Sequence, residues 1–182
     1  MASAPVLPLM SVDEYLNSSW HPDKEYVDGL LVERPLPTVS HALLQIILGA
    51  FFYAVRRQYN CNVLSEARTV VKDRRRYRLP DIQLCPRLSP TDKLVEVVPW
   101  VIIEILSPDD THADMQKRFV EYRERGVPNA LLMDPERYAA YRLEGQLLVQ
   151  FHKTELTLPT GASIPFDADA IFEELRLERA TD

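Results

Sequence analysis

Two short apolar segments that each contain a single acidic residue constrain this chain most. Trp100–Leu106 is apolar on both faces apart from Glu104, and Leu79–Leu84 contains Asp81. A buried, unpaired carboxylate costs several kcal/mol unless a cation or hydrogen bonds offset that cost. The pattern therefore predicts two strands of a covered sheet whose acids share a positively charged partner.

A divalent metal ion is the partner that these residue types favour. Asp81 and Glu104 are 23 residues apart, so they can meet only if their strands are neighbours. Mg²⁺ prefers carboxylates, waters and substrate phosphates as ligands. Such an ion would orient and acidify a water for phosphodiester hydrolysis. The alternative is that an aspartate at the end of a strand, such as Asp81, only forms a turn.

The segment from Thr111 to Arg125 is predicted to be a helix that carries a positive charge to these acids. At about 100° per residue, its buried stripe consists of three residues: Met115, Phe119 and Tyr122. Arg118 falls on the flank of this stripe, whereas Lys117 points almost directly away from it. Arginine stays protonated at any working pH, so it can clamp a phosphate but is a poor general base. Arg118 is therefore the first catalytic candidate and Lys117 the second.

A basic cluster is predicted to bind the backbone of a nucleic acid. The chain has 21 Lys and Arg against 27 Asp and Glu, a net charge of −6, which argues against nucleic-acid binding by the whole surface. Five basic residues are concentrated in one predicted hairpin-like turn: Lys72, Arg74, Arg75, Arg76 and Arg78. Basic clusters supply most of the sequence-independent attraction to phosphates. The alternative is an ordinary solvated turn.

The length and composition predict one globular domain. With 182 residues and 46% hydrophobic content, we expect a single domain at 11–176, a flexible N-terminus at 1–10 and a C-terminal tail at 177–182. Cys61 and Cys85 lie in apolar segments and are typical of buried thiols in a reducing compartment. No apolar run approaches the roughly 20 residues of a membrane span, and the N-terminus lacks the basic start of a secretion signal. A cytoplasmic location without membrane contact is expected.

The order of the predicted elements indicates an α/β protein. A hairpin is expected at 25–32 around Asp28-Gly29, and a second near the C-terminus at 137–152. A long helix is expected at 39–59, with Ser40 as its cap. Strands and helices alternate and later strands pair locally, which predicts a mixed central sheet flanked by helices, with N-terminal and C-terminal β-hairpins.

Several short motifs together resemble the Uma-type restriction endonuclease family, long catalogued as a domain of unknown function in the PD-(D/E)XK nuclease superfamily. The resemblance extends from about residue 11 to 176 and rests on these segments in this order: Glu25-Tyr26-Val27-Asp28-Gly29, His41, Pro80-Asp81, Ile103-Glu104-Ile105-Leu106-Ser107-Pro108, Arg118, Tyr122, Gly126-Val127-Pro128 and Met133-Asp134-Pro135. It implies a restriction-endonuclease-like core with Mg²⁺ or Mn²⁺ as the ion and DNA as the partner.

The resemblance also implies roles for individual residues. Asp81 would be the motif aspartate and Glu104 the second motif acid, while Leu106 stands where the usual lysine would fall. In the family, this lysine is found on the following helix, four residues before the tyrosine, which is Arg118 here. Glu25 matches an early family glutamate and is a further metal ligand, an acid that contacts the metal ligands, or a surface charge at the edge of the hairpin.

Three further residues are candidates for contacts to the metal ligands: His41, Gln83 and Asp114. The functions that remain open are a metal-dependent DNA endonuclease, a nuclease-fold binding or assembly module without turnover, and a metal-dependent hydrolase of another phosphate ester. A homodimer is expected if both strands of a duplex are cut, because that requires two active sites.

Overall fold

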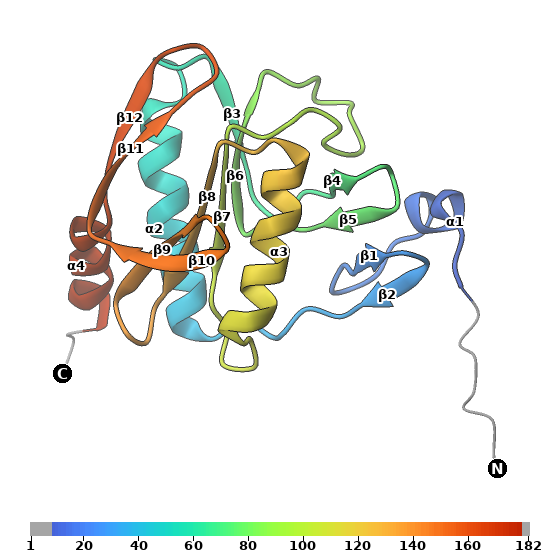
Figure 1. Cartoon of the computed structure of the whole chain (residues 1–182), viewed down its shortest axis with the longest axis horizontal. Coiled ribbons are helices and arrows are strands. Elements are labelled where there is room, and N and C mark those ends of the chain that lie inside the picture. Colours follow the sequence, from blue (N-terminus) through green and yellow to red (C-terminus); the bar gives the residue numbers. More distant parts are fainter. Residues whose placement is uncertain (1–8, 180–182) are drawn as a thin grey trace.

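A six-stranded mixed sheet lies at the centre of the protein and has helices on both faces (Figure 1). The computed structural model describes residues 9–179. In chain order the elements are α1 Val12–Asn17, β1 Glu25–Val27, β2 Leu30–Val32, α2 Val39–Val55, β3 Cys61–Leu64, β4 Thr69–Lys72, β5 Arg76–Arg78, β6 Ile82–Pro86, β7 Val101–Ile105, α3 His112–Arg125, β8 Asn129–Asp134, β9 Ala139–Glu144, β10 Leu147–Phe151, β11 Lys153–Thr157, β12 Ser163–Asp167 and α4 Ala168–Arg179. The central strand order is β10-β9-β8-β7-β6-β3, in which only the β7–β8 pair is parallel. The predicted α/β class with a mixed sheet is confirmed.

The alternation of side chains along β7 separates the two faces of this sheet. Val101, Ile103 and Ile105 pack in the cluster that includes α2 and α4, whereas Ile102 packs in the cluster that includes α3. Successive side chains of a strand point to opposite faces. Glu104 therefore faces the α3 side.

The register between β6 and β7 brings the two predicted acids together. These strands are antiparallel, with Ile82 opposite Ile103 and Gln83 opposite Ile102. One step further along the same register, Asp81 stands opposite Glu104. The predicted adjacency of the two acid-bearing strands is confirmed.

A second sheet, with the order β2-β1-β5-β4, lies beside the central sheet near α1 (Figure 1). Its predicted hairpin turn is present, since Asp28 and Gly29 have φ values of 49° and 96°. The sheet is stabilised by aromatic packing, in which the Tyr15 ring centroid lies 5.0 Å from that of Tyr26 and 5.4 Å from that of Tyr77. β1 and β5 pair here and place Glu25 and Arg78 next to the α3 side of the central sheet.

Two predictions about α2 are wrong in detail. Thr38, and not Ser40, caps the helix, because its hydroxyl accepts a hydrogen bond from His41 N at 3.2 Å. The helix ends at Val55 instead of residue 59, and turns lead from there to Asn60, whose φ is 50°. The N-cap residue is the one whose backbone is still extended, so the cap moves with the true helix start.

The basic segment and the C-terminal region also differ from prediction. Arg76–Arg78 forms strand β5 instead of a turn, because Tyr77 between the two arginines is buried in the aromatic cluster. The second hairpin is present as β9 and β10, but β12 was not predicted, although it pairs with β11 over five residues. Pro165 within β12 obscures its strand pattern in the sequence.

The predicted flexible N-terminus at 1–10 and the predicted tail at 177–182 each overlap the described residues. Residues 1–8 of the predicted flexible segment and 180–182 of the predicted tail lie outside the described residues. Met10 N donates to Gly29 O at 2.9 Å, and residues 177–179 belong to α4. Within the described part of the chain, no helix combines the length and apolar character needed to cross a membrane.

The C-terminus of α3 gives a test of backbone conformation. Gly126 has φ of +92°, and a Cβ added there would meet no atom within 4 Å, so Gly126→Ala introduces backbone strain without a clash. We expect Gly126→Ala to lower the free energy of unfolding in urea by about 1 kcal/mol, and Gly126→Asn by clearly less, because Asn tolerates the left-handed region. Equal losses for the two variants would contradict this account of the helix end.

Candidate active site

Asp81 and Glu104 line one cavity of about 190 Å³ at the α3 side of the central sheet. Both side chains are about 2% exposed. Arg34, His41 and Arg118 line the same cavity. Residues from four parts of the chain, far apart in sequence, therefore meet at the ends of β6 and β7, beside the start of α2 and the middle of α3.

Asp81 is held by three groups. Arg34 Nη2 donates to Oδ1, Ile105 N donates to Oδ2 at 2.7 Å, and His41 Nε2 lies 3.4 Å from Oδ2. Burial by itself raises the pKa of Asp81, but the hydrogen bond from His41 and the charge of Arg34 outweigh it and lower the pKa below its usual value. Asp81 is therefore ionised at neutral pH.

Glu104 has a different balance of forces. Its pKa is raised to about 7, chiefly by burial and also by the negative charges of Asp81 and Glu25, while the charge of Arg118 and the hydrogen bond from Tyr122 act in the opposite direction. Arg118 Nη1 lies 3.2 Å from Oε1, and the Tyr122 hydroxyl donates to the same oxygen. Within residues 9–179, both hydrogen bonds to this carboxylate are made to Oε1, which leaves Oε2 for another ligand.

Glu25 is fully buried, so the interpretation of it as a surface charge is wrong. Its Oε2 accepts from Arg78 Nη1 at 2.8 Å and from Arg118 Nη2 at 3.0 Å, and its Oε1 accepts from Leu79 N at 3.2 Å. Glu25 does not line the cavity. In this structure it anchors Arg118, which bridges Glu25 and Glu104.

The ion pairs continue from Glu25 towards the surface. Arg78 Nη2 lies 2.8 Å from Glu121 Oε2, and Arg76 pairs with both Glu121 and Asp28. The network therefore alternates acid and base from the Asp28 turn through β5 and α3 to the cavity. Each of its buried charges has an opposite neighbour, which is the condition for burying charge at low cost.

Arg118 and Lys117, the two catalytic candidates on α3, point in different directions, as the helical periodicity predicted. Arg118 is largely buried at the cavity, whereas the Lys117 side chain is 77% exposed and its Nζ lies 2.9 Å from Asp114 Oδ1. Neither Lys117 nor Asp114 lines the cavity. Asp114 instead interacts with the helix cap Thr111, and Gln83 is buried against Thr69, whose hydroxyl donates to its Oε1 at 2.9 Å. Lys117, Asp114 and Gln83 are therefore not brought to the site.

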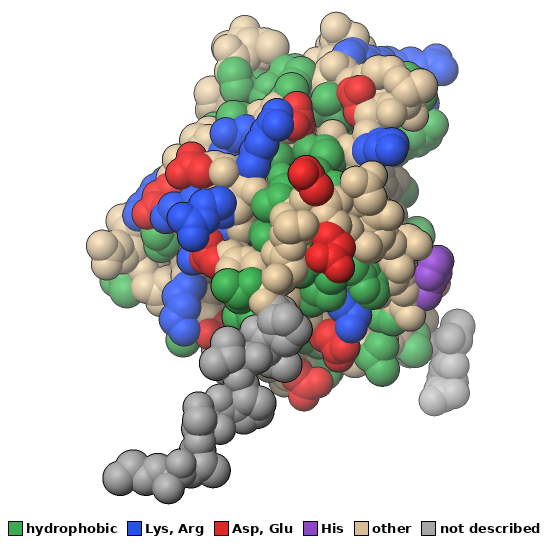
Figure 2. Space-filling model, turned by 90° about the vertical axis from the view of Figure 1, so that its right-hand side faces the viewer, with side chains coloured by type: hydrophobic (Ala, Val, Ile, Leu, Met, Phe, Trp, Pro, Cys, Tyr) green, Lys and Arg blue, Asp and Glu red, His purple; other side chains and the backbone are tan. Residues whose placement is uncertain are grey.

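The basic cluster does not form a continuous positive surface. Figure 2 shows Lys and Arg interleaved with Asp and Glu on the face formed near β4 and β5. Each predicted nucleic-acid contact has an acidic partner: Lys72 with Glu124, Arg74 with Glu96, Arg75 and Arg76 with Asp28, and Arg78 with Glu25. Arg78 belongs to the buried network. Arg74 and Arg75, at 71% and 72% side-chain exposure, have the most accessible side chains of the five.

Sequence reasoning missed Arg34 and Asp110. Arg34 lies 47 positions from its partner Asp81, and the only local signal is its position in the stiff segment Arg34-Pro35-Leu36-Pro37. Asp110 lines the cavity and its Oδ2 accepts from Ser107 N at 2.9 Å; burial raises its pKa. It looked like a turn residue before the helix.

The donor set fits a hard divalent cation in part. Among residues 9–179, no three His, Cys, Asp or Glu side chains are grouped to hold a metal. Mg²⁺, however, is commonly held by one or two carboxylates with waters and substrate phosphates completing its shell. Asp81 and Glu104 supply two such carboxylates at one cavity. Asp81 would have to exchange Arg34 for the ion.

Comparison with known proteins places the chain in a family. Residues 12–168 match the family model Uma2, described as "Putative restriction endonuclease". A crystal structure of "a putative nuclease belonging to DUF820" from Anabaena variabilis is similar, with a TM-score of 0.74 and 21% identity over 91% of this chain and 99% of that one. No curated protein matches. The structural likeness shows a nuclease-type fold, and the family match covers most of the chain: it belongs to the Uma2 family of restriction-endonuclease-like proteins.

Proposed function

We propose that this protein is a metal-dependent endonuclease that hydrolyses phosphodiester bonds of DNA. The single observation that carries the proposal is the pairing of β6 with β7, which turns Asp81 and Glu104 to one cavity beside Arg34 and Arg118. Family membership supports a nuclease. The metal and the DNA substrate are our inference from the chemistry of the cavity.

The ion, Mg²⁺ or Mn²⁺, would be held by the Asp81 carboxylate and by the Oε2 atom of Glu104. When bound, the ion would supply an acidified, oriented water and stabilise the leaving oxygen. Tyr122 and Ile105 N would keep the two carboxylates oriented, since they hold Glu104 Oε1 and Asp81 Oδ2. Glu25 has both oxygens occupied by protein donors, so we assign it the positioning of Arg118.

Arg34 and Arg118 would bind phosphate oxygens of the substrate. Both guanidiniums now neutralise carboxylates at the cavity. A cation held by those carboxylates would balance their charge in place of the arginines, and the guanidiniums would then be available for the phosphate. A planar guanidinium matches a phosphate with two hydrogen bonds and stays charged during the reaction.

His41 would orient Asp81 and would not bind the ion. Its Nε2 faces Asp81 Oδ2, and its Nδ1 is buried without a hydrogen-bond partner among the described residues. The first turn of α2 thus adds one donor to Asp81, and Gln45 Nε2 donates to the Asp81 carbonyl at 3.1 Å. Exposed Arg74 and Arg75 are the members of the basic cluster that we expect to contact the backbone of DNA.

A second function, DNA binding without cleavage, is favoured by one specific observation. Leu106 occupies the position of the motif lysine and packs against the cluster around α3, so no ammonium group is available there. The arginines could then bind phosphate while the chain lacks a group to activate water. The two functions differ in turnover and agree on binding.

Metal binding and cleavage test the proposal directly. We expect Mn²⁺ to bind the native protein in calorimetry and the protein to nick plasmid DNA with Mg²⁺ or Mn²⁺. Asp81→Asn and Glu104→Gln should each weaken Mn²⁺ binding strongly and abolish cleavage, because a ligand charge is lost. Asp114→Asn, which alters an exposed acid outside the cavity, is the matched control and should behave like the native protein.

Three results would decide against this assignment. Ion-independent cleavage would contradict metal catalysis, and DNA binding without any nicking would favour the second function. Hydrolysis of a simple phosphate ester, with plasmid, single-stranded DNA and RNA all untouched, would assign the cavity to another substrate.

Adjacent residues on α3 provide a second test. We expect Arg118→Ala to lower the cleavage rate by about 100-fold, because the guanidinium that bridges Glu25 and Glu104 and would contact the phosphate is lost. Lys117→Ala should change the rate less than about twofold, since Lys117 faces solvent. Thermal unfolding of both variants controls for stability. Equal rates for the two variants would remove Arg118 from the mechanism.

The raised pKa of Glu104 predicts a pH dependence. A cation binds the ionised carboxylate, and with a pKa of about 7 this form becomes scarce as the pH falls below neutrality. Mn²⁺ affinity should therefore be roughly tenfold weaker at about pH 6 than at about pH 8, with proton release on binding. In Glu104→Gln the remaining weak affinity should lose this dependence. A flat profile in the native protein would show that Glu104 does not ligate the ion.

A further inference from the structure

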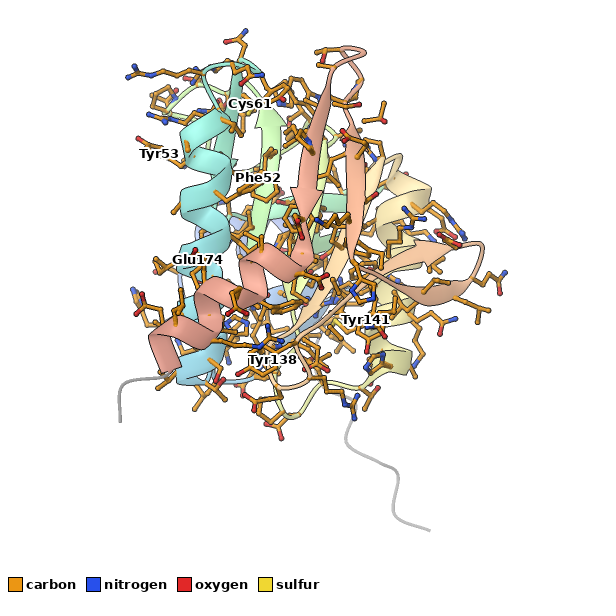
Figure 3. The ribbon with its side chains drawn as sticks, turned by 90° about the vertical axis from the view of Figure 1, so that its left-hand side faces the viewer. Phe52, Tyr53, Cys61, Tyr138, Tyr141 and Glu174 are labelled. Carbon is orange, nitrogen blue, oxygen red and sulfur yellow. The ribbon has the colours of Figure 1, made fainter. Side chains whose placement is uncertain are left out.

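The outward face of α2 is an exposed apolar stripe. Val39, Ile46 and Tyr53 recur every seven residues and are 78%, 73% and 57% exposed. Ala42 and Ala50 lie between them and are also exposed. Figure 3 shows Tyr53 pointing away from the body of the protein, whereas the neighbouring Phe52 points into it.

The composition of this helix is unusual for one with a solvent-exposed face. From Val39 to Val55 it contains no Asp, Glu, Lys or Arg. A surface helix normally carries charged residues on its outer side, and a helix that is apolar all round is normally buried. A seven-residue apolar repeat is, in addition, the pattern with which one helix packs along another. The outer face of α2 is therefore suited to contact with another helix.

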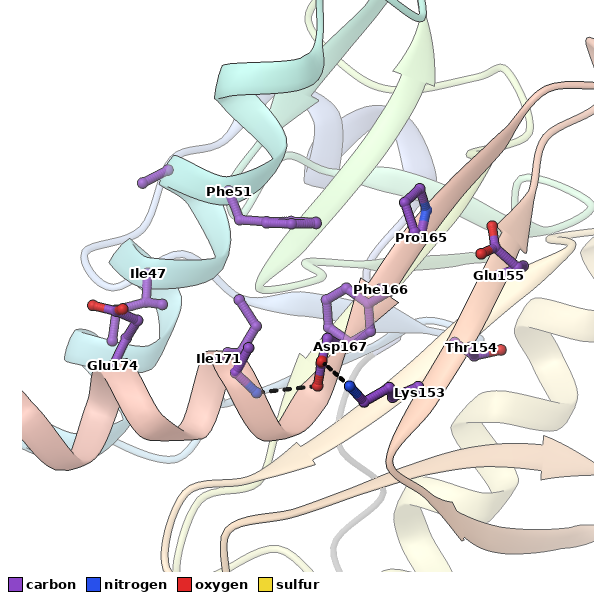
Figure 4. Close-up of a pocket in the computed structure, with 12 residues that line it drawn as sticks. Ile47, Phe51, Lys153, Thr154, Glu155, Pro165, Phe166, Asp167, Ile171 and Glu174 are labelled. Carbon is purple, nitrogen blue, oxygen red and sulfur yellow. Dashed lines mark hydrogen bonds and ion pairs between the residues drawn. The ribbon is translucent and has the colours of Figure 1, made fainter.

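Two hollows flank the stripe, one on each side of Gly49 and Ala50. The larger, about 820 Å³, lies between α2, α4 and the β11–β12 hairpin, with Ile47 and Phe51 on one wall and Ile171 and Phe166 on the other (Figure 4). The smaller, about 470 Å³, is lined by Ile46, Tyr53 and residues of β3 and β6. Both are largely apolar. The exposed face of α2 therefore has a hollow on each side that can accept large side chains of a partner molecule.

We propose that a second copy of this chain packs on α2, with the two α2 helices antiparallel about a two-fold axis at Gly49 and Ala50. Two small residues, half-buried Gly49 and exposed Ala50, would then lie at the crossing point, where backbones must approach closely. The same axis puts Ile46 of one copy opposite Tyr53 of the other, because both are equally far from the axis in sequence. Each copy therefore offers large side chains where the other offers a hollow, as a self-complementary contact requires.

Area and charge both fit this partner. Three exposed side chains, those of Val39, Ile46 and Tyr53, present on the order of 400 Å², and the walls of the two hollows add to this area; a stable interface needs about 800 Å² per partner. The charges lie at the rim: Arg57 follows the C-terminal end of α2, and Glu174 on α4 lies beside Ile47, on the N-terminal side of the proposed axis. The two-fold axis brings the basic end of one copy towards the acidic α4 of its partner.

The arrangement also relates the two cavities. His41, at the cavity, precedes the proposed axis by about nine residues, so the two His41 side chains would lie roughly 25 Å apart along the helices. That separation is less than one turn of duplex DNA. This consequence rests on the proposed function, whereas the contact itself does not.

Sedimentation velocity of the full chain over a range of concentrations tests the proposal. We expect a dimer at micromolar concentration, and a dissociation constant at least 100-fold weaker in Ala50→Arg, which places two unpaired charges at the crossing point. Leu147→Glu is the matched control, because Leu147 is 66% exposed on β10, away from α2, and should leave the dimer intact. Circular dichroism and urea unfolding must show that both variants fold.

A second measurement does not depend on weakening the contact. Oxidised Ala50→Cys should form a covalent dimer on a non-reducing gel, while Leu147→Cys should not; the natural Cys61 and Cys85 are buried. A native protein that stays monomeric, or a dimer that Leu147→Glu disrupts and Ala50→Arg does not, would overturn the proposal. Loss of the dimer with cleavage of single-stranded DNA retained would separate this contact from the nuclease assignment.

Discussion

The cavity depends on a balance between buried carboxylates and buried guanidiniums. Glu25, Asp81 and Glu104 are almost inaccessible to solvent, and Arg118 bridges the first and the last of them while Arg34 holds the second. Removing one partner from such a group leaves an uncompensated buried charge, which typically costs about 3–5 kcal/mol. The second sheet supplies Glu25, which pairs with Arg118, and is therefore part of the site.

The same balance is compatible with the proposed function. The arginines neutralise the acids in this structure. If a cation bound the acids, the arginines would be available for a phosphate, and Tyr122 and His41, which contact the carboxylates, would keep them oriented. Preorganised groups of this kind lower a reaction barrier because they need little rearrangement.

The sequence was most informative where a local pattern has one physical explanation. The single acids in two apolar segments predicted that Asp81 and Glu104 lie on neighbouring strands. Helical periodicity predicted that Arg118 lies beside the core and that Lys117 faces solvent. Arg34 could not be predicted, because its contact with Asp81 depends on how the segment after β2 crosses the start of α2.

The remaining differences have the same origin in long-range packing. Arg78 looked like part of a solvated turn until burial of Tyr77 made that segment a strand and turned the arginine towards Glu25. The acidic partners of the basic cluster come from distant elements, so the positive charge of residues 72–78 is largely balanced in the folded protein, and Arg74 and Arg75 keep the most exposed side chains of the cluster. Charge counted along a chain differs from charge at a surface for this reason.

The central claim is that Asp81 and Glu104 share one divalent cation. Anomalous scattering from a crystal soaked in Mn²⁺ tests it most directly. The account predicts one strong peak within coordination distance of both carboxylates, with Arg34 moved away from Asp81. A cavity without a peak, in which Arg34 still holds Asp81 at saturating Mn²⁺, would contradict it.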